Sequence, residues 1–491
     1  MSEKSKRYLY GASVQGIQDY IFQTNELKDI VGASDLVEAI CTDLFEKMVG
    51  DAYDKDASVV QAAGNIKYVF DDEALCRRVV REFPKKVVGL APGVIISQAV
   101  VALGDDFADA IDRLEARLRE QRNIPMRRPQ LGLMGMRRSR KTGLPAVEVK
   151  NGDYIDRATQ CKQKDSQKVL RLCRKAFGYK ADELTHRHVA YNINDITDRN
   201  NWIAIIHADG NGLGQVVQRI GKNRKEFAQF SCQLNEVTIA AAVDAYRQTV
   251  EGRGTQGCIS MRPVVLGGDD LTVIIRGDLA LPFTEAFLQA FEAYSREQLD
   301  RFVGNKRGLT ACAGIAYIKA SYPSYYGYDL AETLCSQAKK HAKALSENRA
   351  PSCVMIHKVQ DSFVGDYDEL VRRELTPCEG HSFEFGPYFL SVPGAAPYWS
   401  IRELCDAEGK LGGEDGNALK SNLRRWLTAM HSVGGDKRAN QLKDRILDQV
   451  APRLKLLASK LLTGVEVKDC RKYTVYDLLA LCSIDNMVTR K

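Results

Sequence analysis

PVVLGGDDLTVII, residues 263–275, places two glycines and two carboxylates between runs of apolar and β-branched residues. Such runs predict two short strands joined by a tight turn, because glycine adopts backbone angles that other residues resist. The prediction puts Gly267 and Gly268 in the turn and Asp269 and Asp270 at its tip. An Asp after Gly is also ordinary turn chemistry, so this stretch alone does not separate a functional site from a solvated turn.

Another carboxylate, Asp209, ends an apolar run further upstream. NWIAIIHADGNGLGQVV (201–217) predicts a strand, a glycine-rich loop and a helix that reaches about residue 250. The sequence after the hairpin predicts two more helices, near 281–303 and 329–346, and two more strands, at 309–319 and 353–357. This βαββαβ order with an added strand predicts an α+β, ferredoxin-like sheet with its helices on one face. The strand of Asp209 is then a neighbour of the hairpin.

The three carboxylates Asp209, Asp269 and Asp270 therefore predict a metal site. Carboxylates that share one sheet edge repel each other and gain proton affinity unless a cation joins them. Hard oxygen ligands suit Mg²⁺ or Mn²⁺, which keep several waters and accept substrate phosphates. Two such ions roughly 4 Å apart could activate a ribose hydroxyl and stabilise a departing pyrophosphate. The spacing indicates nucleotidyl transfer.

Two further features suit the phosphates of a nucleotide. The loop before the helix offers exposed amides and a helix dipole to a triphosphate. On the predicted helix 329–346, Lys339 and Lys343 stand one turn apart beside an apolar stripe, where they either bind phosphate oxygens or face water. The candidate nucleotide-binding residues of this half are Gly210, Asn211, Gly212, Leu213, Gly214, Gly267, Gly268, Lys339 and Lys343.

Three stretches resemble a known family. HADGNGLG (207–214), VVLGGDDLTVII (264–275) and LTACAGIAYIKASYPSYYGYDLAETLCSQAKKHAK (309–343) are similar to the second palm domain of the large polymerase-like subunit of type III CRISPR effector complexes. The resemblance implies two palm domains and a C-terminal helical domain that contacts neighbouring subunits. It also implies that the protein makes a cyclic oligoadenylate-like messenger from ATP in antiviral defence, with the three carboxylates as catalytic metal ligands.

The N-terminal region repeats the strand-loop-helix and hairpin pattern without its acids. In YLYGASVQGIQDYIF (8–22), Ser13 stands where Asp209 would fall. In VVQAAGNIKYVF (59–70), Ala62-Ala63-Gly64-Asn65 takes the place of the GGDD turn. A strand at 94–103 and a helix at 106–121 extend the parallel, so we expect a duplicated palm that has lost its carboxylates.

The segment 14–37 also resembles the first palm of the same CRISPR subunits. This implies a second nucleotide pocket at the palm–palm interface, with Gln15, Lys28 and Ser34 as lining residues. Alternatively, this segment is an ordinary helix whose apolar residues pack into the core and whose polar residues cap its ends, without a role in nucleotide binding.

Composition and resemblance together divide the chain. Its 491 residues exceed one hydrophobic core, and 44% hydrophobic and 27% charged residues are normal for a soluble globular protein. We expect a degenerate first palm (1–130), a basic linker (131–195), a second palm (196–360) and a mainly helical C-terminal domain (361–491). No apolar run approaches the roughly 18 residues of a membrane span and no signal peptide is visible, so we expect a cytoplasmic protein with no membrane contact.

The linker region carries the basic excess, in 126–144 and 162–180. Such density suits the phosphates of nucleic acid or nucleotides, or it forms a solvated face. The related subunits commonly carry a Cys-rich zinc element here. This chain keeps the Gly-Leu-Pro-Ala ending at 143–146 without cysteine pairs, so we do not expect structural zinc. About six residues stand where a nuclease domain often precedes the first palm, so we do not transfer DNA cleavage.

Three functional hypotheses follow. The leading one is a Mg²⁺- or Mn²⁺-dependent nucleotidyltransferase that uses ATP. The second is an RNA-binding scaffold subunit of an effector complex with little activity, and the third is a stand-alone cyclic-nucleotide synthase outside CRISPR. The corresponding partners are nucleoside triphosphates, guide or target RNA, other effector subunits, or a second copy of the chain in a homodimer.

Overall fold

The hairpin predicted at 263–275 forms in the computed structural model. Strands β8 (Met261–Gly267) and β9 (Asp270–Arg276) pair antiparallel, and Gly267 faces Asp270 across a two-residue turn. Of the two glycines, Gly268 has the positive φ, +64°, that a residue with a side chain rarely adopts. The turn therefore depends on Gly268 for its backbone shape.

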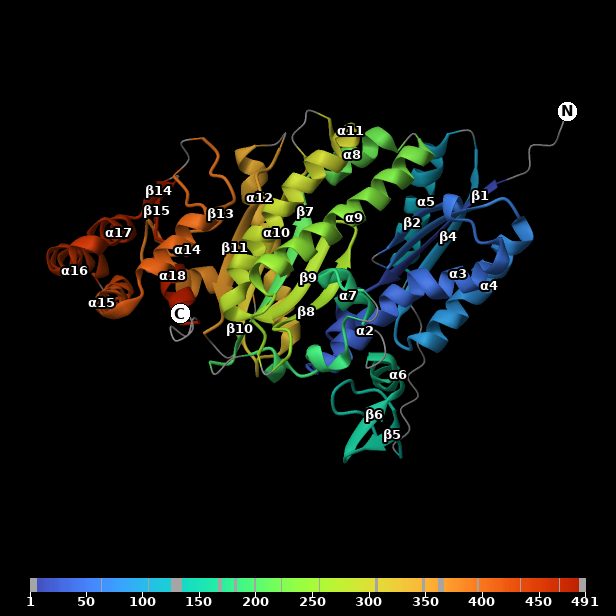
Figure 1. Ribbon diagram of the computed structural model, residues 1–491, viewed down its shortest axis with the longest axis horizontal. Coiled ribbons are helices and arrows are strands. Elements are labelled where there is room, and N and C mark those ends of the chain that lie inside the picture. Colours follow the sequence, from blue (N-terminus) through green and yellow to red (C-terminus); the bar gives the residue numbers. More distant parts are fainter. Residues whose placement is uncertain are drawn as a thin grey trace.

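The structure describes residues 7–484 except 63, 105, 125–134, 167–169, 181–182, 198–199, 222, 256, 305–307, 347–348, 361–365, 395–396, 433 and 468. Two sheets lie beside each other along the long axis of the molecule, with the C-terminal helices at one end (Figure 1). Within the described parts, no helix is both long and apolar enough to cross a membrane.

The second palm is built on a six-stranded sheet. Its further elements are β7 (Trp202–Gly210), α8 (Leu213–Ile220), α9 (Arg224–Thr249), α10 (Gly277–Gln298), α11 (Asp300–Val303), β10 (Ala311–Lys319), α12 (Ser324–Leu345), β11 (Cys353–Lys358) and β13 (Tyr388–Phe389). The strand order is β13-β11-β10-β7-β9-β8, so β7 lies next to the hairpin as predicted. Antiparallel β10-β7-β9-β8 is the ferredoxin-like core, and β11 adds a strand parallel to β10.

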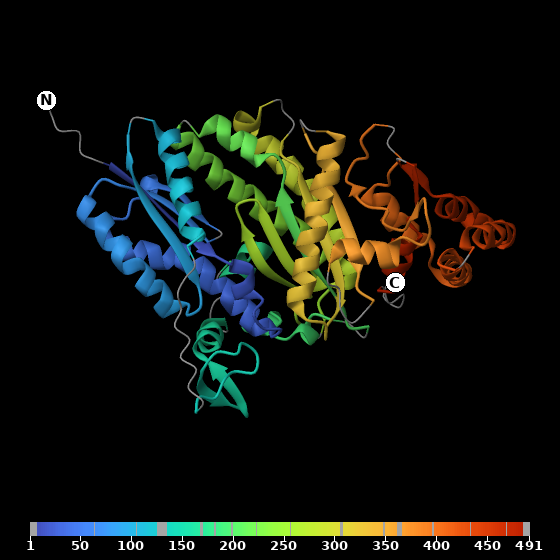
Figure 2. The same ribbon diagram turned by 180° about the vertical axis from the view of Figure 1, so that it is seen from behind.

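The expectation that all helices cover one face of this sheet is wrong. Helices α9 and α10 pack on one face, in front of the sheet in Figure 1, whereas α12 covers the other, in front in Figure 2. Strand β7 explains the difference because it is apolar on both sides. Ile203 and Ile205 belong to the core under α12, and Ala204 and Ile206 belong to the core under α9 and α10. The predicted α12 stripe, Leu330, Leu334, Ala338 and Ala342, is buried as expected.

The first palm repeats this topology. Its elements are β1 (Arg7–Gln15), α1 (Ile17–Ile21), α2 (Leu27–Ala39), α3 (Phe45–Val49), β2 (Ser58–Ala62), β3 (Asn65–Phe70), α4 (Glu73–Leu90), β4 (Ile95–Leu103) and α5 (Phe107–Arg122). The strand order β2-β3-β1-β4 matches β8-β9-β7-β10 of the second palm. The duplication expected from the sequence is therefore present in the strand order, although Ala63 of the corresponding turn lies outside the described residues.

The two palms pack reciprocally. Helix α9 of the second palm contacts the edge strand β2 of the first, and α2 of the first contacts the edge strand β8 of the second. The Ser34 hydroxyl on α2 donates a hydrogen bond to the carbonyl oxygen of Val264 on β8. Both hydrophobic cores contain side chains from both palms, so the pair forms one packed unit.

Between the palms, a small linker module projects from the body (Figure 1). Its elements are β5 (Ala146–Lys150), β6 (Asp153–Asp156) and α6 (Arg157–Ser166), followed by α7 (Arg171–Phe177), which packs on α9 and β8. Asn151 (φ +52°) and Gly152 (φ +84°) form the turn between β5 and β6, the Asn-Gly signature of a two-residue hairpin. Residues 126–134 and 167–169 of the predicted basic segments lie outside the described residues.

The C-terminal region is mainly helical, as expected, and adds a small sheet. Its elements are α13 (Tyr367–Leu370), β12 (His381–Ser382), α14 (Ile401–Lys410), α15 (Gly413–Met430), α16 (Gly435–Gln449), α17 (Pro452–Thr463), β14 (Val465–Val467), β15 (Cys470–Lys472) and α18 (Val475–Cys482). Helix α18 packs on β11, and the Tyr388 hydroxyl on β13 donates to Asp477 on α18 at 2.6 Å, with both side chains buried. This region therefore continues the core of the second palm.

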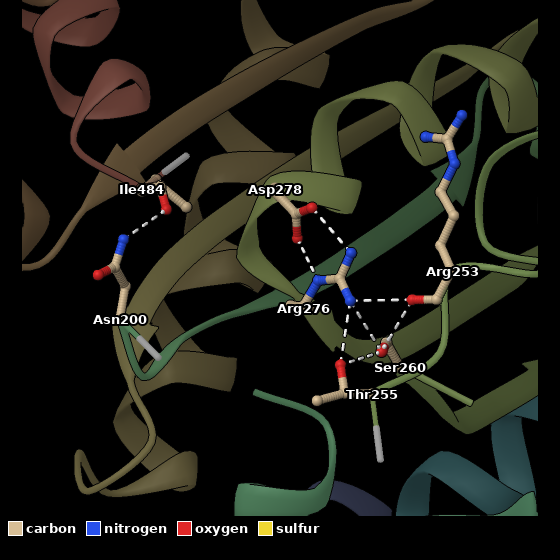
Figure 3. A network of polar contacts seen from close by, with 7 residues as sticks. All are labelled: Asn200, Arg253, Thr255, Ser260, Arg276, Asp278 and Ile484. Atoms are coloured by element: carbon tan, nitrogen blue, oxygen red, sulfur yellow. Dashed lines mark hydrogen bonds and ion pairs between the residues drawn. The ribbon is translucent and has the colours of Figure 1, made fainter. Parts of the chain in front are cut away.

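A polar network fixes the end of β9 that lies opposite the carboxylates (Figure 3). The Arg276 guanidinium donates to both carboxylate oxygens of Asp278, and to the carbonyl oxygen of Arg253 and the Thr255 hydroxyl at 2.9 and 3.0 Å. It joins the loop that follows α9 to the start of α10. Strand β9 is thus held at its last residue as well as in its ladder.

Candidate active site at the GGDD turn

Three carboxylates converge at one end of the second palm sheet. Asp209 is the penultimate residue of β7, Asp269 lies in the turn, and Asp270 begins β9. One oxygen of each lies within 4.8 Å of the others, although about 60 residues separate Asp209 from the pair. The register explains the meeting, since Ala208 pairs with Leu271 and the next positions are the two aspartates. The structure brings together the three residues that the sequence predicts as metal ligands.

The loop after β7 is shaped to admit the turn. A Cβ at Gly210 would lie 3.0 Å from Cβ and 3.3 Å from Oδ2 of Asp269, so a larger residue here would press on this carboxylate. Gly212 has φ +77° and caps α8, and Gly214 is exposed on its first turn. Helix α8 therefore begins three residues after Gly210, at the end of β7 that carries Asp209.

Other predicted loop residues serve the fold. The buried Asn211 amide donates to the Thr310 hydroxyl at 3.1 Å and to Cys312 Sγ at 3.2 Å, and Leu213 packs against the hydrophobic core. Gly267 is buried in the hairpin ladder. These three residues shape the loop and turn through packing and hydrogen bonds, and their contact with a nucleotide stays a prediction.

Two residues of helix α9 form hydrogen bonds with the turn. The Thr238 hydroxyl, fully buried, donates to the carbonyl oxygen of Gly268 at 2.7 Å, and the Gly268 amide donates to Asn235 Oδ1 at 3.3 Å. Sequence reasoning missed both residues, which lie on a long helix with no local sign of this role. Their bonds fix the direction in which the neighbouring carboxylate leaves the turn.

Lys339 lies among the carboxylates. It forms an ion pair with Asp209, and its ammonium donates to the carbonyl oxygen of Gly210 at 3.0 Å. Burial lowers the pKa of this ammonium, but the Asp209 carboxylate outweighs burial and leaves the pKa raised. Lys343, one turn further, is exposed. The two lysines predicted as a phosphate-binding pair thus differ, because one already neutralises a metal-ligand candidate.

The electrostatics of the cluster are those of crowded, partly buried acids. Burial, and then the neighbouring carboxylates, raise the pKa of Asp269 to about 8 and that of Asp270 to about 7. Asp269 also shares a hydrogen bond with Asp209, which a carboxyl proton can occupy. Such a site binds protons when no cation is present, and these protons are released when a divalent ion binds in their place. The donor set, three hard oxygens, fits Mg²⁺ or Mn²⁺.

One face of α12 lines the site with residues that the sequence analysis did not single out. Tyr328 and Glu332 precede Lys339 on this face at helical spacing, a signal that the sequence offered. His207, two residues before Asp209 on the same side of β7, accepts or donates a hydrogen bond with Thr272 at 3.0 Å. Burial lowers the pKa of His207 to about 4, so the ring is neutral near pH 7.

The first palm reaches the site through the segment from α1 to α2. The Phe22 ring stacks on the Tyr328 ring with centroids 4.6 Å apart, and Asn25 Oδ1 accepts from the amide of Ser324 at 3.1 Å. Gln15, at the end of β1, donates to the carbonyl oxygen of Ser13 at 3.2 Å. Ser34 lies at the palm–palm interface, where the sequence put it, but there its buried hydroxyl is bonded to Val264.

Lys28 lies apart from these contacts. It lines a separate cavity against the linker module and is 4.0 Å from Glu26. A role for Gln15, Lys28 and Ser34 in binding a second nucleotide stays a prediction.

The corresponding position of the first palm is uncharged. Ser13 pairs with Asn65 at the start of β3, as Asp209 meets Asp270 at the start of β9. The Ser13 hydroxyl donates to Asn65 Oδ1 at 2.8 Å. A neutral hydrogen bond thus replaces two carboxylates, and among its described residues the first palm offers no comparable ligand set at this point.

Comparison with known proteins identifies relatives of the second palm and of the whole fold. Residues 202–346 match the family model of the Cas10/Cmr2 second palm domain. No curated protein sequence matches the chain. Among solved structures, the fold is similar to Csm1 in a Csm1–Csm4 cassette in complex with cA3, with a TM-score of 0.57 and 15% identity over 99% of this chain and 70% of that one.

Two further solved structures share the fold. One is an apo Csm1–Csm4 cassette, with a TM-score of 0.53 and 15% identity over 99% of this chain and 70% of that one. The other is a Csm1–Csm4 subcomplex of the type III-A CRISPR-Csm interference complex, with a TM-score of 0.53 and 15% identity over 99% of this chain and 72% of that one. The chain is therefore Cas10-like: it is similar to the large palm-domain subunit of type III CRISPR effector complexes, and residues 202–346 correspond to that subunit's second palm.

Proposed function

We propose that this protein is a metal-dependent nucleotidyltransferase that joins ATP molecules into a cyclic oligoadenylate-like messenger. The observation that carries the proposal is the convergence of Asp209, Asp269 and Asp270 within 4.8 Å at the end of the second palm sheet. Crowded carboxylates with raised pKa values are costly for folding, and a divalent cation offsets that cost. Structures of the same fold with cA3, cA4 and pppApApA bound support the choice of product class.

The residues of the chain divide the work in this proposal. Asp209, Asp269 and Asp270 would hold Mg²⁺ or Mn²⁺, which lowers the pKa of an attacking ribose hydroxyl and stabilises the departing pyrophosphate. Lys339 pairs with Asp209 and places a positive charge where phosphate oxygens would arrive. The amides at the start of α8 would face the same space and suit a triphosphate.

The first palm completes the site without supplying acids. Its segment from α1 to α2 lies against the start of α12, so an acceptor nucleotide between the palms would contact both copies. One metal-bearing palm is sufficient to form each phosphodiester bond, because the second nucleotide needs only to be positioned. The neutral Ser13–Asn65 pair fits this division.

The solved relatives also support a proposal about assembly. They are Csm1–Csm4 cassettes, and one belongs to a type III-A interference complex. We propose that this chain likewise binds a Csm4-like subunit in a CRISPR effector.

Product analysis tests the catalytic proposal. The purified chain, alone and with its effector partners and target RNA, is incubated with Mn²⁺ and labelled ATP, and products are identified by mass spectrometry. We expect pyrophosphate and a phosphatase-resistant oligoadenylate from the wild type and none from Asp269→Ala/Asp270→Ala. Asp112→Ala, which removes an exposed carboxylate on α5, serves as the control.

Two outcomes contradict the proposal. A wild type that is inert with every nucleoside triphosphate under all these conditions refutes catalysis. If the inert protein still binds RNA, and the double variant binds it equally well, the chain is an RNA-binding scaffold.

A further inference from the structure

A second candidate site lies away from the carboxylates, in a cavity of about 110 Å³ between the linker module and the start of α2. Four cationic side chains line it: Lys28, Arg140, Lys141 and Lys150. Asp153 is the acidic side chain in the lining. The excess of positive charge favours an anionic ligand and disfavours a metal ion.

The charges of these side chains are only partly neutralised. Glu26 lies 3.0 Å from the Lys141 ammonium and 4.0 Å from that of Lys28. Arg140 and Lys150 are exposed, and neither has an ion-pair partner within 4 Å among the described residues. At least two cations therefore remain available to a ligand.

The walls of the cavity are fixed by close packing. Helix α6 approaches α2 so closely that a Cβ at Gly32 would lie 1.9 Å from the carbonyl oxygen of Lys162. The Lys162 ammonium, fully buried, donates to the carbonyl oxygen of Tyr20 at 2.7 Å and to Gln23 Oε1 at 3.1 Å, and it lies 4.1 Å from the centre of the Tyr20 ring. The module is thus anchored to the first palm, and the cavity between them has a defined shape.

Size and chemistry together select the ligand class. The cavity, of about 110 Å³, has room for one phosphate group. Ser139 is buried in its wall, Thr159 is buried beside it with its hydroxyl donating to Asp156 at 2.8 Å, and the rim carries the cations. Tyr154 is also in the lining; the Arg137 guanidinium lies 5.8 Å from the centre of its ring, which leaves the other face of the ring for a base attached to the phosphate.

We propose that this cavity binds a phosphate group of a nucleotide or of single-stranded RNA, at a site separate from the GGDD carboxylates. Lys28 then has a role distinct from the palm–palm pocket predicted for it. The connection through Lys162 places the ligand on the same anchored unit as the segment that contacts Tyr328.

Binding measurements test this site independently of catalysis. The background is the full chain carrying Asp269→Ala/Asp270→Ala, in EDTA, so that metal-dependent binding at the carboxylates is removed. The probes are a fluorescent single-stranded RNA 12-mer and fluorescent ATP, measured by anisotropy over a range of salt concentrations. Arg140→Gln/Lys150→Gln is compared with Lys85→Gln/Lys86→Gln, which removes the same charge from the exposed side of α4.

We expect the Arg140→Gln/Lys150→Gln change to weaken binding about tenfold, and the salt slope for RNA to fall by about 0.7, since the cavity holds one phosphate and each lost phosphate contact contributes about 0.7. The Lys85→Gln/Lys86→Gln control should bind as the background does. An effect on RNA alone identifies the source of the phosphate as RNA, and an effect on ATP alone identifies a nucleotide. Arg140→Lys/Lys150→Arg should restore binding, because it keeps both charges.

Two results overturn the proposal. One is that Arg140→Gln/Lys150→Gln leaves the binding of both probes unchanged. The other is that binding falls equally in the control Lys85→Gln/Lys86→Gln. Melting temperatures equal to that of the background establish that each variant is folded, so a loss of binding reports the site.

Discussion

Replacing Asp269 by Asn should stabilise the metal-free protein at alkaline pH and leave it unchanged at acidic pH. Asn is well tolerated in a turn and keeps the size of the side chain, so the main change is the loss of one charge. In the folded protein the pKa of this carboxyl is raised to about 8, compared with about 3.8 for a free aspartate. The folded state therefore binds more protons than the unfolded state between about pH 4 and pH 8, and wild-type stability falls as pH rises through this window.

The size of the effect follows from the geometry. Two unit charges 4.8 Å apart interact by about 3.5 kcal/mol at an effective dielectric constant of about 20. Asp269 has two such neighbours, but Lys339 and residual proton binding offset part of the repulsion. We therefore expect Asp269→Asn to raise the free energy of unfolding by about 2 kcal/mol at pH 8.5, which corresponds to about 2 °C in apparent melting temperature for a chain of this length. Only below about pH 3.8 is Asp269 protonated in both the folded and the unfolded state, so the two proteins should melt together at about pH 3.

Differential scanning fluorimetry at both pH values, in EDTA and in Mn²⁺, provides the measurement. In Mn²⁺ at one hundred times its dissociation constant, wild type should gain about 2.7 kcal/mol at pH 8.5, and Asp269→Asn should gain much less because one ligand is missing. Asp112→Asn on α5 removes an exposed carboxylate and should match wild type throughout.

Two results would refute this reasoning. If Asp269→Asn melts at or below wild type in EDTA at pH 8.5, the three carboxylates do not repel each other in the folded state. If Mn²⁺ stabilises the variant as much as wild type, the ion binds elsewhere.

Three further substitutions test the architecture of the site. Gly210→Ala should weaken Mn²⁺ stabilisation and lower product formation, because its Cβ would lie 3.0 Å from a side chain of the turn, whereas Gly214→Ala, whose Cβ would have no neighbour within 4 Å, should leave Mn²⁺ stabilisation unchanged. Thr238→Val should lower the free energy of unfolding by about 1–2 kcal/mol and weaken Mn²⁺ binding, because the carbonyl of the turn loses its buried donor. Electron paramagnetic resonance measures the Mn²⁺ binding, and Thr238→Ser should restore both the stability and the binding. Phe22→Ala should lower the free energy of unfolding by about 3–5 kcal/mol and speed hydrogen exchange at the start of α12, because it removes a buried ring stacked on Tyr328. An unchanged exchange rate there would contradict the inter-palm contact.

The second palm could be predicted from the sequence where local signals are strong. The Gly-rich turn, the apolar runs of the hairpin and the α12 stripe each depend on residues close together in the chain, and all three appear in the structure. The approach of Asp209 to the turn also followed, because a ferredoxin-like strand order fixes which strands are neighbours. The Asn151-Gly152 turn gave an equally local signal, which the sequence analysis did not use.

The parts that could not be predicted depend on contacts between distant segments. Strand β7 is apolar on both sides, so its pattern does not reveal which face α12 covers. The ion pair of Lys339 and the interface bond of Ser34 both require the packed positions of two elements. Thr238 resembles any threonine within a helix, and only its bond to the turn shows its role.

The reciprocal packing of the palms also protects the molecule from aggregation. Strands β2 and β8 are sheet edges, and an uncovered edge is a template for pairing with strands of other molecules. Each edge is shielded by a helix of the other palm, so neither copy could be removed without exposing its neighbour. A duplicate that has lost its acids is thereby retained as a cover for the active copy, and an isolated second palm should form insoluble oligomers even with every carboxylate intact.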